Sequence, residues 1–297
     1  MGGGHMSNRI DKAIARAQAE GRVAFIGLVP IDPDSMERTR AVADMMIASG
    51  VDIVMVHIPN WMPWMEGGVL QLAARAPRNA GVTREQIFAF IKQLRAAYPK
   101  VPLIDMTLYD TAATMGQGRF LQLSAEADVD GFDLPNYPLI RTGDRFGLYQ
   151  YCLEHDRHLI LAISYELATA PEGTPEYEML CEMARRARGF AFVMNAPGGQ
   201  SGSSVKLTRR ELADAVSRVK AVMAQEGNDR CTVSIVCGIS SREDVEKVKS
   251  SGAASFMIGS AYVKYLQEGR PLEEVSRYLK GIRAMCAYGE GTGNESD

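Results

Sequence analysis

Glycine- and serine-rich segments in the last third of the chain carry the clearest chemical signal. Glycine lets backbone N–H groups approach an anion closely, and the positive end of a following helix attracts negative charge. An ordinary tight turn would explain any one of these segments, whereas three of them after three successive apolar runs favour a phosphate site. The candidate phosphate-binding residues are Ser201, Gly202, Gly238, Ser240, Gly259 and Ser260.

Short apolar runs alternate with longer amphipathic stretches along the chain, a pattern typical of βαβ units around a parallel sheet. The expected strands are residues 23–29, 52–58, 101–108, 131–134, 158–163, 190–194, 232–236 and 255–258. The expected helices between them are residues 35–49, 84–97, 118–127, 143–155, 175–188, 208–225 and 241–250. This order predicts an α/β fold, a (β/α)8 TIM barrel, with an extra N-terminal helix at residues 7–21 that caps its bottom.

No linker divides the chain, so residues 7–288 are expected to form a single barrel domain. Residues 1–6 have the composition of a cloning scar, and the polar, glycine-rich residues 289–297 are expected to be a disordered tail. Long connections at residues 59–81 and 196–207 are expected on the face where barrel active sites are built.

Composition excludes several classes of function. The net charge is −3 and no cluster of Lys and Arg stands out, which argues against a nucleic-acid partner. No apolar run reaches the roughly 18 residues of a membrane span. The 5 cysteines are scattered and form no CxxC pair, so disulfides are not expected and the cytoplasm is the predicted location.

The chain resembles the α subunit of tryptophan synthase over nearly its whole length. The best-matching stretches are DGFDLP at residues 130–135, GIS at 238–240 and IGSA at 258–261. The resemblance implies a barrel that cleaves indole-glycerol phosphate by retro-aldol chemistry. It also implies that Gly202, Gly238, Gly259 and Ser260 hold the phosphate.

Departures from the family's pattern lie at the catalytic positions. Met55 stands where the family has a glutamate on strand 2, and a thioether cannot transfer a proton. Glu66 replaces an aspartate of the following loop, Leu108 replaces a pocket tyrosine, and Asp133 stands at an apolar pocket position. We therefore expect a lyase whose phosphorylated substrate has an apolar body and which does not perform ordinary indole release.

We assign acid/base work to Asp133 and Glu66, because the carboxylate missing at Met55 is relocated to these positions while the phosphate-binding segments are retained. Side chains alternate along a barrel strand, so His57 faces inward with Met55 and can orient the catalytic groups. The plainer alternatives are a structural histidine, a salt bridge at Asp133 and a solvated Glu66. The expected substrate pocket consists of Met55, Trp61, Met106, Leu108, Phe192 and Met194.

Two other functions stay open at this point. A fainter resemblance to the geranylgeranylglyceryl phosphate synthase group implies a prenyltransferase that acts on a phosphorylated three-carbon acceptor with Mg²⁺. Asp32 would be the candidate metal ligand, although a helix-capping turn also explains it. No other cofactor is expected.

The other possibility is a barrel that binds a phosphorylated ligand or a partner without turnover. Tryptophans and methionines in the strand 2 loop, at residues 61–65, could contact a partner subunit or a second copy of the chain.

Overall fold

A computed structural model of the 297-residue chain describes residues 8–60, 62–199 and 205–288. Eight parallel strands follow one another around a closed barrel, and the last strand pairs with the first. The strands are β1 (Ala24–Pro30), β2 (Ile53–His57), β3 (Leu103–Met106), β4 (Gly131–Asp133), β5 (His158–Ile163), β6 (Phe190–Met194), β7 (Thr232–Val236) and β8 (Ser255–Ile258). The predicted TIM barrel is thereby confirmed.

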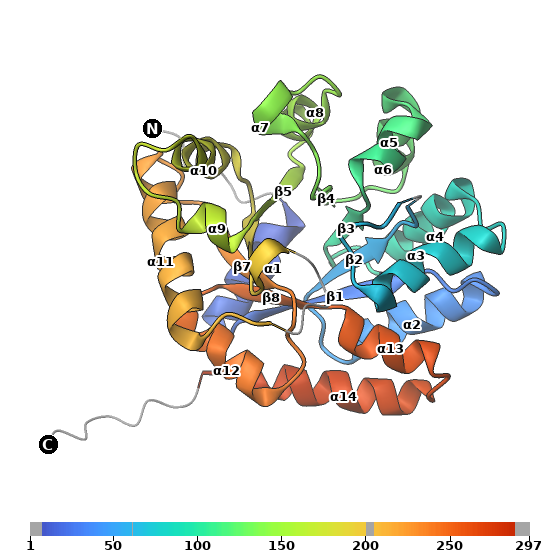
Figure 1. The fold of residues 1–297 in the computed structure, drawn as a ribbon. Coiled ribbons are helices and arrows are strands. Elements are labelled where there is room, and N and C mark those ends of the chain that lie inside the picture. Colours follow the sequence, from blue (N-terminus) through green and yellow to red (C-terminus); the bar gives the residue numbers. More distant parts are fainter. Residues whose placement is uncertain (1–7, 61, 200–204, 289–297) are drawn as a thin grey trace, which may run out of the picture.

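Helices surround the strands in chain order, as the colour sequence from blue to red shows in Figure 1. The helices are α1 (Arg9–Ala19), α2 (Met36–Ala48), α3 (Gly68–Asn79), α4 (Arg84–Ala97), α5 (Tyr109–Met115), α6 (Gln117–Glu126), α7 (Leu139–Thr142), α8 (Leu148–Glu154), α9 (Tyr165–Ala168), α10 (Pro175–Arg186), α11 (Arg209–Gln225), α12 (Arg242–Ser251), α13 (Ser260–Gln267) and α14 (Leu272–Met285), with a short 3-10 turn, η1, at Pro197–Gly199. Within the described residues, none of these helices has both the length and the apolar composition that crossing a bilayer requires.

Two expectations about the connections were wrong. The long connection at residues 59–81 contains α3, whose buried face includes Leu70 and Ala74 and whose interior Pro77 hides the helical pattern in the sequence. The helix expected at residues 143–155 begins only at α8, because Gly143 and Gly147 adopt φ values of 74° and 72°, which a helix cannot accommodate.

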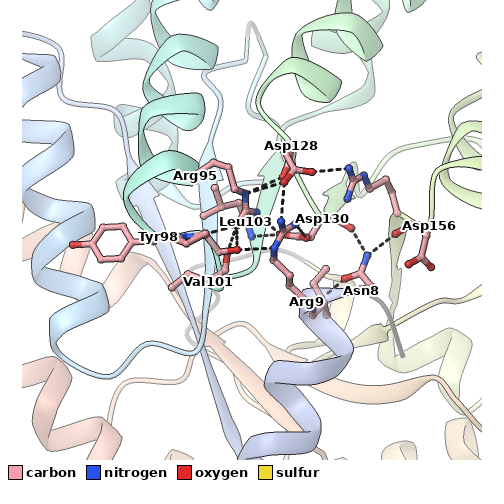
Figure 2. A network of polar contacts seen from close by, with 12 residues as sticks. Asn8, Arg9, Arg95, Tyr98, Val101, Leu103, Asp128, Asp130 and Asp156 are labelled. Carbon is pink, nitrogen blue, oxygen red and sulfur yellow. Dashed lines mark hydrogen bonds and ion pairs between the residues drawn. The ribbon is translucent and has the colours of Figure 1, made fainter. Parts of the chain in front are cut away.

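Helix α1 closes the bottom of the barrel through a network of charged contacts (Figure 2). Arg9 Nη1 and Arg95 Nη2 donate to the two carboxylate oxygens of the buried Asp130, at 2.8 and 2.5 Å. The backbone N–H of Leu103 donates to the same carboxylate at 2.8 Å, and Asn8 Nδ2 donates to the Asp130 carbonyl at 3.0 Å. Because these partners satisfy the buried charge, Asp130 fixes the start of β4 relative to β3 and α1.

A second contact holds α1 at the base of β5. His158 Nε2 lies 3.0 Å from both carboxylate oxygens of Asp11. Gly189, with a φ of 70°, packs directly against the imidazole, since a Cβ at this position would lie 2.4 Å from His158 Cδ2. The ends of the strands opposite α1 are therefore left to form the open mouth of the barrel.

Candidate active site

Three neighbouring strands carry paired residues near the barrel mouth. His57 on β2 is in register with Met106 on β3, which is in register with Asp133 on β4. Residues paired across parallel strands project to the same side of the sheet. Met106 and Asp133 line a cavity inside the barrel, so this row of residues faces inward. Met55 lies two residues before His57 on β2 and therefore also faces inward, where it is fully buried.

The loop after β2 brings Glu66 into the mouth. The Glu66 carboxylate lies 2.8 Å from His57 Nε2, measured at Oε1, and the same oxygen accepts from Asn60 Nδ2 at 3.3 Å. Gln71 Nε2 also donates to the Glu66 carbonyl at 2.8 Å. Glu66 is only 7% exposed, and its Oε2 has no hydrogen-bond partner among the described residues. His57 thus holds one oxygen of the carboxylate and leaves the other unused.

Asp133 is the second carboxyl group that lines this cavity. Its side chain is 3% exposed and forms no ion pair with any described residue, and Oδ1 lacks a hydrogen-bond partner there. Burial and, secondarily, the negative charge of Glu66 raise the pKa of Asp133 to about 7. Near neutral pH this carboxyl can therefore exist in both protonation states, as a general acid or base requires.

A cavity of about 70 Å³ lies in front of these carboxyl groups. Four expected pocket residues line it, namely Met106, Leu108, Phe192 and Met194. Met55 is not in the lining and is fully buried in the barrel core. Trp61 is outside the described residues.

The cavity lining also contains Thr107 and Cys237, which sequence reasoning missed. Cys237 has a φ of 75°, uncommon for a residue with a side chain. Burial, together with the charge of Asp133, raises the pKa of its thiol to about 12. Cys237 is therefore a neutral, weakly polar part of the wall and not a thiolate nucleophile. The sequence feature that could have identified Cys237 as a site residue is its position directly before Gly238, at the end of an apolar run.

The candidate phosphate residues fall into three groups. Gly259 is the N-cap of α13 and Ser260 its first residue, and no side chain of the described residues caps this helix, so its first N–H groups can bind an anion. Gly238 has a φ of 70° and lies at the end of β7, next to β8 in the barrel. Ser201 and Gly202 lie outside the described residues.

Ser240 differs from the other candidates because its donors already have a partner. Its backbone N–H and its hydroxyl donate to Asp244 Oδ2 at 2.9 and 3.3 Å. The N–H of Ser241 donates to the same oxygen at 3.1 Å, and Lys206 Nζ lies 2.8 Å from Oδ1. Asp244 therefore occupies the N-terminus of α12, and the open helix end is that of α13.

Asp32 forms the turn that leads into α2. Its Oδ1 accepts from the backbone N–H groups of Asp34 and Ser35, at 2.9 and 3.0 Å. Within residues 8–60, 62–199 and 205–288, no group of three or more His, Cys, Asp or Glu side chains is arranged to hold a metal ion.

A wider groove of about 560 Å³ lies at the opposite end of the barrel, between α1 and the first residues of β5 and β7. It contains none of the predicted site residues. Because active sites of this fold form at the C-terminal ends of the strands, the smaller cavity at the mouth is the better candidate.

Comparisons with known proteins show which family the chain resembles. The family model described as "Tryptophan synthase alpha chain" matches residues 14–287. The tryptophan synthase alpha chain of Rippkaea orientalis is 30% identical over 257 residues, 86% of each chain. That of Methanosarcina barkeri is 27% identical over 260 residues, 87% of this chain and 89% of the relative.

Solved structures show the same fold. A structure of Mycobacterium tuberculosis tryptophan synthase superposes with a TM-score of 0.78 at 22% identity, covering 95% of this chain and 99% of the other. Tryptophan synthase subunit alpha from Legionella pneumophila gives a TM-score of 0.75 at 20% identity, covering 94% and 98%.

Proposed function

Because the chain belongs to the tryptophan synthase alpha chain family, we propose that it is a carbon–carbon lyase that acts on a phosphorylated substrate with a largely apolar body. The observation that carries the proposal is the pair of buried carboxyl groups, Glu66 and Asp133, at one cavity. Met55 stands where the family has its strand 2 glutamate. Ordinary cleavage of indole-glycerol phosphate is therefore not the expected reaction.

The two carboxyl groups divide the proton transfers of a retro-aldol cleavage. Asp133, protonated below about pH 7, donates its proton to the carbon of the leaving body. Glu66 accepts the proton of the substrate hydroxyl, whose carbon becomes a carbonyl as the carbon–carbon bond breaks. One proton is given and one is taken, so a proton transfer from Glu66 to Asp133 restores the starting state. His57 orients Glu66 through the 2.8 Å contact.

The phosphate anchors the other end of the substrate. The first N–H groups of α13, at Ser260, and the backbone of Gly238 and Gly259 would bind it, with Ser201 and Gly202 as further candidates. These segments follow β6, β7 and β8, where phosphate sites form in barrels of this type. Anchoring there directs the body of the substrate into the cavity at the mouth.

Two conservative substitutions test the assignment. Native mass spectrometry of freshly purified protein would first give the mass of any bound ligand and so guide the choice of substrate. Glu66→Gln and Asp133→Asn keep size and polarity but cannot transfer a proton, so each should lower turnover by about 100-fold or more. Full turnover in both variants would show that the assignment is wrong.

Asp105 provides the matched control. It is a buried aspartate whose pKa burial also raises to about 7, but its Oδ2 accepts from Ser124 Oγ on α6, behind the sheet. Asp105→Asn should therefore keep turnover. Equal losses in Asp105→Asn and Asp133→Asn would indicate a general effect of losing a buried carboxyl.

The prenyltransferase alternative gains no support from the comparisons, because the matching family model and the curated relatives named above are tryptophan synthase alpha chains.

A partner surface is compatible with the proposal. Met62 and Trp64, in the loop after β2, are 67% and 56% exposed near the mouth. Contact with a partner subunit or a second copy there would bury them, and sedimentation of the chain with and without Trp64→Ala checks this.

A further inference from the structure

The cavity at the barrel mouth is lined mainly by apolar side chains, with three polar residues gathered on one side. These three residues, Glu66, Thr107 and Asp133, are called the polar wall here, and they lie among apolar residues such as Met106 and Leu108. The side formed by β5 to β8 is apolar, and its residues are Ala162, Phe192, Met194, Val236 and Met257. A ligand that fills the cavity needs a largely apolar surface and polar groups where it meets the polar wall.

Three atoms of the polar wall have no hydrogen-bond partner among the described residues. They are Glu66 Oε2, Thr107 Oγ1 and Asp133 Oδ1, and each is buried. Buried polar atoms in folded proteins nearly always have partners, because leaving one unpaired is destabilising. Glu66 illustrates the contrast, since its Oε1 is bonded by His57 and Asn60 while Oε2 is left unused.

The same atoms differ in what they can bond. A carboxylate oxygen of Glu66 only accepts, the Thr107 hydroxyl both donates and accepts, and the Asp133 carboxyl donates when protonated. A single N–H group on a ring, as in indole, can donate to Glu66 Oε2, whose two lone pairs also serve the reacting hydroxyl of the substrate. Thr107 Oγ1 and Asp133 Oδ1 would stay buried beside a hydrocarbon edge.

Resting on the proposed function, we infer that the body of the substrate is a fused ring with at least two hydrogen-bonding groups along one edge. One group is an N–H or amino donor for Glu66, and another is a hydroxyl, carbonyl or ring nitrogen for Asp133 and Thr107. The opposite face of the ring packs on Phe192 and Met194. Such a substrate is a polar-edged relative of an indole-type ring and not a simple hydrocarbon.

Binding of ring fragments tests this without any need for turnover. Benzimidazolone is uncharged and presents N–H, C=O and N–H along one edge, whereas indole presents one N–H. Calorimetric titrations would use the full-length chain in the presence of inorganic phosphate. We expect benzimidazolone to bind at least tenfold more tightly than indole. Equal or tighter binding of indole would overturn the inference.

Substitutions in the polar wall locate the preference. Asp133→Leu should lower the affinity for benzimidazolone at least tenfold and raise the affinity for indole. Thr107→Val, which keeps the shape of the side chain, should lower only the affinity for benzimidazolone and covers the case that Asp133→Leu does not fold. Asp105→Asn, behind the sheet, should change neither affinity. An unchanged ratio of affinities in Thr107→Val and in any folded Asp133→Leu would refute the inference.

The two proposals fail in different ways. If the wild type prefers benzimidazolone and Glu66→Gln and Asp133→Asn keep full turnover, only the catalytic assignment is refuted. If those variants lose turnover and the wild type binds both fragments equally, only the inference about the ring is refuted.

Discussion

Replacing Asp133 by asparagine should change how the stability of the protein depends on pH. The pKa of Asp133 is raised to about 7 from an ordinary value of 3.8. Between these values the folded chain holds a proton that the unfolded chain has released, so the free energy of unfolding falls as pH rises. Below pH 3.8 both states are protonated at this position, and above about pH 7 both are ionised, so the fall is confined to this window.

The size of the fall follows from the width of the window. At 1.36 kcal/mol for each pH unit, the ionised carboxyl lowers the free energy of unfolding by about 4 kcal/mol by pH 8. Asparagine is neutral throughout and lacks this term. Relative to the wild type, Asp133→Asn should therefore gain about 3 kcal/mol between pH 5 and pH 7.5. Other carboxylates affect both proteins equally and cancel in the difference.

Urea denaturation at intervals between pH 4.5 and 8.5, followed by far-ultraviolet circular dichroism, measures this difference. Asp105→Asn should show a gain of the same sign, because burial also raises the pKa of Asp105 to about 7. If wild type and Asp133→Asn differ by a constant amount across this range, burial does not keep Asp133 protonated. Its role as a general acid near neutral pH would then be excluded as well.

Three further substitutions test the framework around the site. Met55→Glu places an unpaired carboxyl in the core and should lower the free energy of unfolding in urea by about 3 kcal/mol at neutral pH. Gly189→Ala forces a Cβ to 2.4 Å from His158 Cδ2 and should lower the melting temperature more than Gly173→Ala, where φ is 79° but nothing lies within 4 Å. Asp130→Asn leaves the two arginines of Figure 2 without their buried partner and should lower the free energy of unfolding by about 3–5 kcal/mol, with faster amide exchange in α1.

The barrel could be predicted because its strands are buried on both sides and appear as nearly continuous apolar runs. The bounds of β5 to β8 agree with the predicted ranges, and polar or glycine residues flank the runs of β5 and β6 on both sides. The absence of α14 from the predicted helices is different, because Val275, Leu279 and Ile282 do follow helical spacing and form its buried face. The signal was present there, whereas in α3 an interior proline obscured it.

The site could be predicted only as far as the strands extend. Alternation along β2 and β4 indicates that His57 and Asp133 face inward, and the register of the strands agrees. Alternation also implies that Thr107 points away from the barrel, because it follows the inward-facing Met106. β3 ends at Met106, however, so the pleat no longer constrains the next residues, and Thr107 and Leu108 both reach the cavity. The contact of Glu66 with His57 depends on the path of a loop, which no periodicity records.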